Sequence, residues 1–460
     1  MNRRSPLWKW LYPGMHVKRW IALGFIGLIL FLLGAAIMLQ AHRGRPPLIL
    51  RLAQWIIQHL HAGIRPGLFG LCLFLLGGVL CLFALGKLIQ SLMSALDPEI
   101  ARGGLVDVVY TRRKLAQGKR VVVIGGGTGL STLLRGLKRY TSNITAIVTV
   151  ADDGGSSGKL RRQLNILPPG DIRNCLVALA DAEPQMTELF QFRFRASMGS
   201  ERLPANGDGV PKGEYAEGLR DHAFGNLLIA AMCAINNGDF ERAVQETSRV
   251  LNIRGRVLPS TVTPVKLRAE MEDGSILEGE TTIVESPLRI KRVALVPLDP
   301  NDKICPVEEA LDAIAEADLI VLGPGSLFTS ILPNLLVPGI PEAIRRSQAQ
   351  KAYVCNVMTQ PGETDGFSAC DHVRALEIHV GPRLFTYVVV NNAVPEPRLL
   401  EKYRRAGSVL VEPDTDRLKA EGYRPVVGAF ISETDVVRHD AVLLAEALMG
   451  LIGGKSLRKR

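Results

Sequence analysis

The stretch Val121-Val-Val-Ile-Gly-Gly-Gly-Thr-Gly-Leu-Ser131 decides the class of fold that this chain adopts. Arg120–Ile124 has the β-branched residues of a short strand, and the glycines after it allow a sharp turn. Leu130–Tyr140 then places apolar residues at helical spacing. The free N–H groups where such a helix begins favour an anion. The stretch predicts a phosphate-type site at Gly125, Gly126, Gly127, Thr128 and Gly129, with a structural tight turn as the alternative.

The glycine spacing departs from both common nucleotide fingerprints. With Gly125 and Gly127 as the first two glycines of G-x-G-x-x-G, the third position is Leu130, and no G-K-[ST] follows. An NAD-dependent oxidoreductase therefore stays open only as an alternative. The sequence contains no G-x-S-x-G elbow and no recognisable Ser/His/Asp spacing, so it indicates no covalent mechanism.

Strands and helices alternate along most of the chain. Further short strands are expected at Ile144–Val150, Leu319–Leu322, Ala352–Val357 and Thr386–Val390. This alternation predicts an α/β fold with a Rossmann-like, doubly wound, mostly parallel sheet covered on both faces. Val265–Val284 instead alternates apolar and polar residues around Asp273–Gly274, which predicts a β-hairpin inserted into that core.

A second glycine-rich loop, Ala151-Asp-Asp-Gly-Gly-Ser-Ser-Gly-Lys159, follows the second expected strand. One of its acids could bind a ribose hydroxyl. Asp152 and Asp153 could instead hold Mg²⁺ that bridges phosphates. The glycines offer N–H donors beside the hydroxyls of Ser156 and Ser157. An Asp-capped loop without a ligand is the structural alternative.

Two further polar segments precede expected helices. In Pro168-Pro-Gly-Asp-Ile-Arg-Asn174, Asp171 is expected to be an N-cap, and Arg173 and Asn174 could reach a phosphate or a base. In Arg220-Asp-His-Ala-Phe-Gly-Asn226, His222 and Asn226 share a helix face if the helix of Leu227–Ile235 starts early. His222 could be an acid–base group, a ligand donor or a structural residue. No second histidine has metal-ligand spacing, which argues against zinc.

The C-terminal half contains similar segments. Leu322-Gly-Pro-Gly-Ser-Leu-Phe-Thr-Ser330 ends a strand and brings Gly325 and Ser326 to the same sheet edge, and Asn356–Thr364 is another polar loop after a strand. Val437–Asp440 is expected to start the last helix, where Arg438 could clamp a phosphate. Tyr403 could stack on a base. A plain surface role is the alternative for Tyr403 and Arg438.

The N-terminal region has the composition of a membrane anchor. Trp20–Ala41 and Pro66–Gly86 are long apolar runs without a charged residue, and about 20 residues suffice to span a bilayer. Leu48–Leu60 between them could be an interfacial amphipathic helix or a plain loop helix. We expect a membrane anchor with two transmembrane helices at 1–87, a connector at 88–118, a nucleotide-binding domain at 119–454 and a basic tail at 455–460.

Charge and cysteine content bear on the partners and the compartment. Residues 1–120 carry 16 Lys and Arg but only three Asp and Glu, whereas the rest of the chain is slightly acidic. A basic excess beside apolar runs indicates a membrane surface, and it argues against nucleic acid. The seven cysteines include no C-x-x-C pair, which is typical of reduced thiols. We therefore expect a cytoplasmic domain anchored to the inner (cell) membrane.

Several long motifs, in order, resemble one known family. The runs VVVIGGGTGLSTLLRGLK, TVADDGGSSGKLR and LPPGDIRNCLVALA, followed by HAFGNLL, GPGSLFTS and NVMTQPGET, are similar to the gluconeogenesis factor (YvcK-type) family. This is the bacterial branch of the superfamily of phospholactate transferase (CofD). The resemblance covers roughly Lys119 to Leu451, and the family is usually described without the N-terminal spans.

The resemblance implies a Rossmann-like core that binds UDP-sugars such as UDP-N-acetylglucosamine, and a role in cell shape and cell-wall homeostasis during gluconeogenic growth. It implies a regulator rather than an enzyme. The implied site comprises the glycines after the first strand, Asp152, Asp153, Asp171, Asn174, His222 and Asn226, with Tyr403 on the base side and Arg438 on the phosphate side. A Mg²⁺-dependent phospholactate-type transferase is the enzymatic alternative. A homo-oligomer and contacts with cell-wall synthesis proteins are further expectations.

Overall fold

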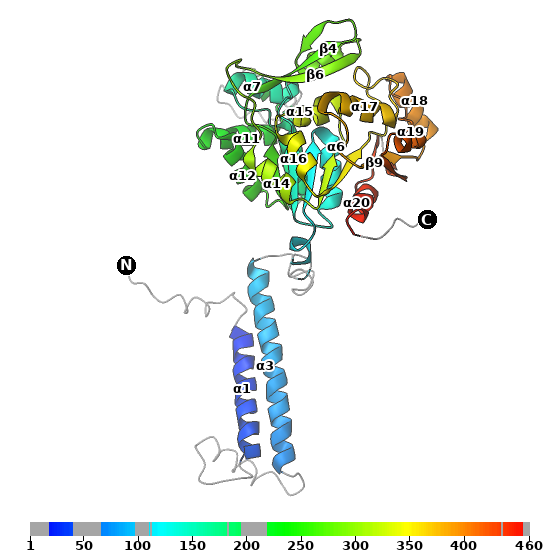
Figure 1. Ribbon diagram of the computed structural model, residues 1–460. Coiled ribbons are helices and arrows are strands. Elements are labelled where there is room, and N and C mark those ends of the chain that lie inside the picture. Colours follow the sequence, from blue (N-terminus) through cyan, green and yellow to red (C-terminus); the bar gives the residue numbers. More distant parts are fainter. Residues whose placement is uncertain are drawn as a thin grey trace. The chain divides into compact units, whose positions relative to one another are not determined.

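Figure 1 shows the computed structural model of the chain, in which residues 18–39, 66–96, 110, 113–181, 184–194, 219–433 and 436–453 are described. The chain forms two compact units, Met1–Arg113 and Lys114–Arg460. The amphipathic helix predicted at Leu48–Leu60 and the basic tail at 455–460 lie outside the described residues.

The first unit contains two long apolar helices, α1 (Lys18–Leu39) and α3 (Pro66–Leu96). Both are long and apolar enough to cross a membrane, and α3 continues beyond Lys87. Glycines bring their backbones together: a Cβ on Gly34 would overlap the amide of Phe74, and one on Gly77 would overlap the amide of Phe31. Lipid supplies no hydrophobic drive for helix association, so such close backbone packing stabilises the pair.

A bulky side chain at Gly77 should therefore separate α1 from α3. Cys81 lies between these helices, with its Sγ 3.5 Å from the Gly24 carbonyl oxygen, whereas Cys72 on the same helix is exposed. In the full chain in detergent micelles, we expect Gly77→Leu to raise the maleimide-labelling rate of Cys81 several-fold relative to Cys72. Gly86→Leu is the control, because a Cβ at Gly86 meets nothing within 4 Å. Equal Cys81 rates in the two variants would contradict this packing.

The second unit is built on a seven-stranded sheet in the order β10-β9-β8-β7-β1-β2-β3, and every neighbouring pair is parallel. Its strands are β1 (Val121–Gly125), β2 (Ile144–Val148), β3 (Arg256–Pro259), β7 (Leu319–Leu322), β8 (Gln350–Val354), β9 (Tyr387–Asn391) and β10 (Arg424–Gly428). The predicted parallel α/β sheet is confirmed. The strand predicted at Leu319–Leu322 has the observed bounds. The ends of the other predicted strands differ by at most three residues, because polar or glycine residues end each strand slightly earlier or later than the apolar run does.

Helices cover both faces of this sheet, so its strands are buried on both sides. Val121 and Val123 of β1 belong to one apolar core, and Val122 and Ile124 belong to the other. The first core is closed by α6 (Gly127–Leu137), α8 (Gly170–Leu179), α11 (Phe224–Ile235), α12 (Phe240–Val250) and α20 (Ala441–Gly450). The second is closed by α14 (Glu308–Glu316), α15 (Leu332–Leu335), α16 (Ile340–Arg346), α17 (Ala369–Val380) and α19 (Thr415–Ala420).

The strand order reverses between β1 and β7. From β1 the chain continues to β2 and β3 on one side, and β7 to β10 follow on the other. In open α/β sheets, ligands bind at such a switch point, outside the carboxyl ends of the strands. The loops after β1 and β7 lie on the two sides of this switch point.

A three-stranded antiparallel sheet is inserted between β3 and β7. It comprises β4 (Val265–Met271), β5 (Ile276–Glu278) and β6 (Ile290–Pro297), and β4 and β5 form the predicted hairpin around Gly274. The prediction that this hairpin extends to Val284 is wrong. Gly279 has a φ of +94° and ends β5, and α13 (Glu280–Glu285) follows it.

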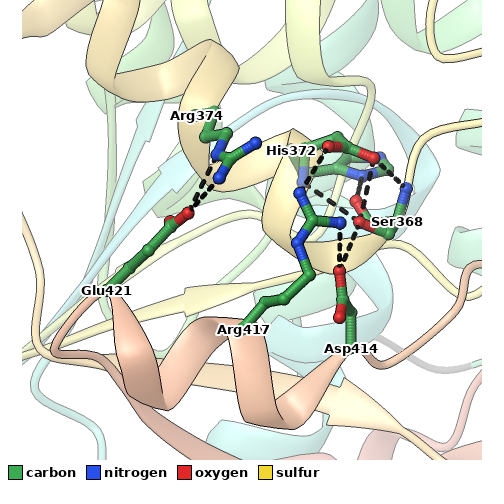
Figure 2. A network of polar contacts seen from close by, with 7 residues as sticks. Ser368, His372, Arg374, Asp414, Arg417 and Glu421 are labelled. Carbon is green, nitrogen blue, oxygen red and sulfur yellow. Dashed lines mark hydrogen bonds and ion pairs between the residues drawn. The ribbon is translucent and has the colours of Figure 1, made fainter.

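Polar contacts join α17 to α19 beside the second core (Figure 2). Ser368 and Asp371 form the capping box of α17, and the Ser368 hydroxyl also donates to Asp414 at 3.0 Å. Arg417 pairs with Asp414, and Arg374 pairs with Glu421. These bonds are explained by helix capping and packing, so this polar cluster needs no ligand.

Candidate functional site

The first glycine loop joins β1 to α6 at the switch point. Gly126 is the N-cap of α6 and makes no side-chain cap bond, and Gly127 has a φ of +68°. The backbone N–H of Gly127 donates to the carboxylate of Asp171. The N–H of Gly127, which the sequence predicted to be available to a phosphate, is therefore already bonded to a protein carboxylate.

The loops after β1 and β7 are in backbone contact. A Cβ on Gly129 would lie 2.8 Å from the carbonyl oxygen of Pro324, and one on Gly325 would lie 3.2 Å from the carbonyl oxygen of Gly126. Glycine is therefore required here for packing between loops. The structural explanation of the glycines and the ligand-binding one are compatible, since the same close approach exposes backbone groups to a ligand.

A cleft of about 300 Å³ opens along these two loops. This volume is at the lower end of the usual range for small-molecule sites. Its lining includes backbone from both glycine loops and side chains from three later segments, namely Gly126, Gly127, Thr128, Gly129, Gly325, Ser326, Ser330, Asn356, Met358, Gln360, Tyr403, Arg438 and His439. Tyr403 and Arg438, far apart from the glycine loops in sequence, therefore lie at the same cleft.

One side of the cleft is apolar and contains the aromatic ring. Tyr403 is on α18 (Pro397–Arg405) and packs with Val357, Met358 and Val437. Its hydroxyl accepts the backbone N–H of Val437 at 3.1 Å. This bond fixes the ring beside the strand that carries Arg438.

The prediction that Val437–Asp440 starts the last helix is wrong in part. Val437–His439 is a strand, β12, which pairs antiparallel with β11 (Ile431–Glu433). Its side chains alternate between buried and exposed, as expected for a strand and not for a helix. Asp440 alone begins the helix, and its carboxylate accepts the N–H groups of Val442 and Leu443. Arg438 is exposed on the strand, and buried His439 beside it has a pKa lowered to about 4 by burial.

Asn356 and Gln360 are cleft residues that the sequence argument did not single out. Asn356 donates to the Gly325 carbonyl oxygen at 2.9 Å, and Gln360 donates to the Ser326 hydroxyl at 2.7 Å. Both follow β8 at the carboxyl edge of the sheet. That position, directly after a buried strand, was the signal that could have identified them.

Ser156, Arg173, His222 and Asn226 form a second polar cluster beside the first loop rather than lining this cleft. The Ser156 hydroxyl accepts from Asn226 Nδ2 at 3.0 Å and lies 3.1 Å from His222 Nδ1. Arg173 donates to Asn226 Oδ1 at 3.0 Å and to Asn174 Oδ1 at 2.8 Å. Burial lowers the pKa of Arg173 to about 10, so it stays cationic at neutral pH, and its Nε has no partner among the described residues.

Two predicted helix positions in this cluster are corrected. Asp171 is not an N-cap, because α8 begins at Gly170 with Pro169 as N-cap, so Asp171 falls inside the helix and its carboxylate accepts from the first glycine loop. His222 precedes α11, which begins at Phe224, so it does not share a helix face with Asn226. The shared Ser156 hydroxyl, on α7 (Gly155–Leu164), brings the two side chains together instead.

The paired aspartates have different partners. Asp152 accepts the N–H of Gly154 at 2.8 Å and is also hydrogen-bonded by Ser157, and burial raises its pKa. Asp153 accepts the N–H and the hydroxyl of Thr281 at 3.0 and 2.8 Å, and it thereby caps α13 of the inserted sheet. Within the described parts of the chain, no group of three or more His, Cys, Asp or Glu has metal-holding geometry. Magnesium at Asp152 and Asp153 stays a prediction.

Carboxyl groups from four segments interact electrostatically near the first loop. Burial and the charge of Asp152 raise the pKa of Asp171 to about 6. Burial, followed by the charges of Asp152, Asp171, Glu363 and Asp153, raises the pKa of Glu280 to about 9. The site therefore holds more negative charge than its buried surroundings favour.

The stability of the domain should fall as pH rises because of Glu280. Its folded pKa is about 9 and its ordinary value is 4.5, so the folded state retains a proton that the unfolded state loses between these values. In urea unfolding, we expect the stability advantage of Glu280→Gln over the wild type to grow with pH from 5 to 8, by about 1 kcal/mol per pH unit. Glu285→Gln, at the exposed end of α13, is the control. An advantage that does not change with pH would contradict the electrostatic account.

Gly129→Ala should destabilise the domain by about 2 kcal/mol, because the new Cβ meets the Pro324 carbonyl oxygen. Gly450→Ala is the matched control: Gly450 is also helical, and its Cβ would meet nothing within 4 Å. Both variants gain helix propensity, so the difference between their urea midpoints isolates the contact between the loops. Equal midpoints would show that the loops can separate without cost.

The fold is that of an α/β protein with two glycine loops at the switch point of a parallel sheet. The family model described as 2-phospho-L-lactate transferase CofD matches residues 121–431. The chain belongs to this CofD-like family, and its relatives there are named as gluconeogenesis factors.

The gluconeogenesis factor of Bacillus subtilis is 48% identical over 74% of this chain and 99% of its own length. A protein from Nostoc sp., whose name also contains the words "gluconeogenesis factor", is 44% identical over 98% of this chain and 94% of its own. A crystal structure of a UPF0052 family member from Bacillus halodurans is 49% identical, with a TM-score of 0.64 over 72% of this chain and 99% of that one. The match to the Nostoc protein extends over the N-terminal region, so at least one relative has a corresponding region.

Proposed function

We propose that this protein is a UDP-sugar-binding regulator whose ligand lies in the cleft between the loops after β1 and β7. The observation that carries the proposal is the composition of this cleft. It combines glycine backbone and the hydroxyls of Ser326 and Ser330 with an aromatic ring and an arginine. A nucleotide diphosphate needs both a polar surface for its phosphates and a flat apolar surface for its base.

In this proposal the diphosphate lies along the two glycine loops, and Arg438 supplies a cation to it. The base stacks on Tyr403, whose ring is held by the bond from Val437 N–H to its hydroxyl. Arg173, Asn174, His222 and Asn226 are bonded to one another or to Ser156 outside this cleft, and in this proposal they do not touch the diphosphate. A Mg²⁺ ion at Asp152 and Asp153 remains part of the proposal, and both carboxylates already accept hydrogen bonds within the protein.

The names of the relatives support a regulatory role in gluconeogenic growth, and we extend it to cell shape and cell-wall homeostasis. The two apolar helices of the first unit support anchoring of the domain to the cell membrane. We place the domain on the cytoplasmic side, where its four buried free cysteines, Cys175, Cys233, Cys355 and Cys370, would stay reduced.

A transferase is the second candidate, and the description of the matching family model favours it. Such an enzyme would move a phospho-hydroxyacid from a nucleotide diphosphate to an alcohol. Product formation from a nucleotide-activated phospholactate, abolished by Asp152→Asn, would establish this activity. The oxidoreductase alternative is weaker, because Leu130 at the third fingerprint position is fully buried in the first core.

Calorimetric titration of the full chain in detergent micelles tests the proposal. With UDP-N-acetylglucosamine, UDP-glucose, GDP and NAD, each with and without Mg²⁺, we expect selective micromolar binding of a UDP-sugar. Tyr403→Ala should weaken binding about 10- to 100-fold through lost stacking, since stacking on an aromatic ring contributes about 1–3 kcal/mol. Arg438→Ala should weaken it by a similar factor.

Arg404→Ala is the matched control, because Arg404 is an exposed arginine of the same helix as Tyr403 and pairs only with Glu401 in the described part of the chain. We expect its affinity to equal that of the wild type. A preference for GDP would transfer support to the transferase, and a preference for NAD to the oxidoreductase. Failure of the folded wild type to bind any of these ligands would refute the proposed site.

A further inference from the structure

Glu363 is a buried carboxylate that lies under the glycine loop after β7, which comprises residues 323–326. It belongs to the loop between β8 and α17 and is 6% exposed. Its Oε2 accepts the backbone N–H of Phe328 at 3.3 Å, and its Oε1 accepts the hydroxyl of Thr329 at 3.2 Å. Both oxygens are therefore used to hold the first turn of the helix that follows Ser326.

That helix has no cap of its own. The π-helix η3 (Leu327–Ile331) follows Ser326, which makes no side-chain cap bond. Glu363 satisfies a donor that Ser326 leaves open, although it lies 35 residues beyond Phe328. Single π-helical turns are frequent at functional sites, and they need tertiary contacts to persist.

The segment 356–363 holds the loop after β7 and the helical turn that follows it at three points. Asn356 bonds to Gly325, Gln360 bonds to Ser326, and Glu363 bonds to Phe328 and Thr329. The turn is closed by an internal hydrogen bond, in which Thr364 Oγ1 accepts the N–H of Gln360 at 2.9 Å. Among these three holding residues, only Glu363 can change its charge.

We propose that Glu363 is a positioning residue that sets the shape of the 323–330 segment lining the cleft, and that ligand binding is thereby coupled to proton uptake by this carboxyl group. The proposal rests on the proposed function, because the ligand must be an anion at this cleft. Ser326 and Ser330 line the cleft, and Phe328 and Thr329 between them are held by Glu363.

The charges around Glu363 agree with this coupling. Burial raises the pKa of Glu363 to about 7, against the effect of the bonds from Phe328 and Thr329. Glu280 on α13 interacts with it electrostatically, and Asp152, Asp153 and Asp171 interact with Glu280 in turn. The other charged or titratable groups close by are Asp365 in the same turn, which accepts from Gly362, and His379 on α17, whose ring lies 5.8 Å from that of Phe328.

The direction of the effect follows from the signs of the charges. An anionic ligand beside Gly325 and Ser326 disfavours a second negative charge on Glu363, so it raises the pKa of this carboxyl further. Binding near neutral pH then takes up a proton, and affinity falls as pH rises from 6 to 8. A nucleotide sugar is a suitable probe, because its two phosphates lack the ionisation near pH 6 that a terminal phosphate has.

The test is calorimetric titration of UDP-N-acetylglucosamine into the full chain in micelles at pH 6, 7 and 8. At each pH, two buffers of different ionisation enthalpy give the number of protons taken up. For the wild type we expect uptake of a fraction of a proton at pH 7 and several-fold tighter binding at pH 6 than at pH 8.

Glu363→Gln imitates the protonated carboxyl group, so its affinity should change little between pH 7 and pH 8, and it should take up fewer protons there than the wild type. Any uptake by Asp171, whose pKa is about 6, should remain at pH 6. Thr329→Val removes the hydroxyl bond that favours the carboxylate, so it should shift the midpoint of the affinity profile to higher pH. Glu285→Gln, at the exposed end of α13, is the control and should keep the pH dependence of the wild type.

The outcomes separate this inference from the proposed function. A wild type that binds without proton uptake, or a Glu363→Gln variant that keeps the wild-type profile, overturns the role of Glu363 and leaves the proposed function intact. A midpoint unchanged in Thr329→Val would also overturn it, even if Glu363→Gln does not fold. Absence of binding by the folded wild type refutes the proposed function, and this inference with it.

Discussion

Contact between the backbones of two glycine loops is the constraint on which the rest of the site depends. The loops after β1 and β7 meet at the switch point of the sheet, where Gly129 lies against the Pro324 carbonyl and Gly325 against the Gly126 carbonyl. Side chains cannot occupy this space, so the edge of the sheet presents backbone and hydroxyl groups. The cleft exists because later segments, which carry Tyr403 and Arg438, close over this polar edge.

Carboxylates attach these loops to the surrounding layers. Asp171 on α8 binds the loop after β1, and Glu363 in the segment after β8 binds the loop after β7. Asp153 binds the loop after β2 to the inserted sheet. Collecting acids near a cleft that we propose for an anion is electrostatically unfavourable, as the raised pKa values of Glu280, Asp171 and Glu363 indicate. Functional sites commonly carry such perturbed groups. A cation or bound protons would each relieve part of this repulsion, whereas an anionic ligand alone would add to it.

The sequence was sufficient for the parallel sheet and the glycine loops because both depend on local patterns. Runs such as Val121–Ile124 are buried on both faces, and glycines end them. It was insufficient for Val437–His439, whose strand depends on pairing with β11, and for Asp171, whose partner is a distant amide. Asn356, Gln360 and Glu363 were passed over individually, because their roles arise only when the loop after β8 meets the loop after β7. Long-range contacts of this kind leave no periodic signal in the sequence.

Hydrogen–deuterium exchange of the full chain, with and without saturating UDP-N-acetylglucosamine, tests the central claim most directly. The account predicts that slowed exchange appears together in the segments 125–129, 323–330, 356–364 and 436–439, which come from four separate parts of the chain and meet at one cleft. The two apolar N-terminal helices and the face of α17 towards α19 should exchange as before. Protection confined to any other region at saturating ligand would contradict the account, since the ligand would then lie away from the two glycine loops.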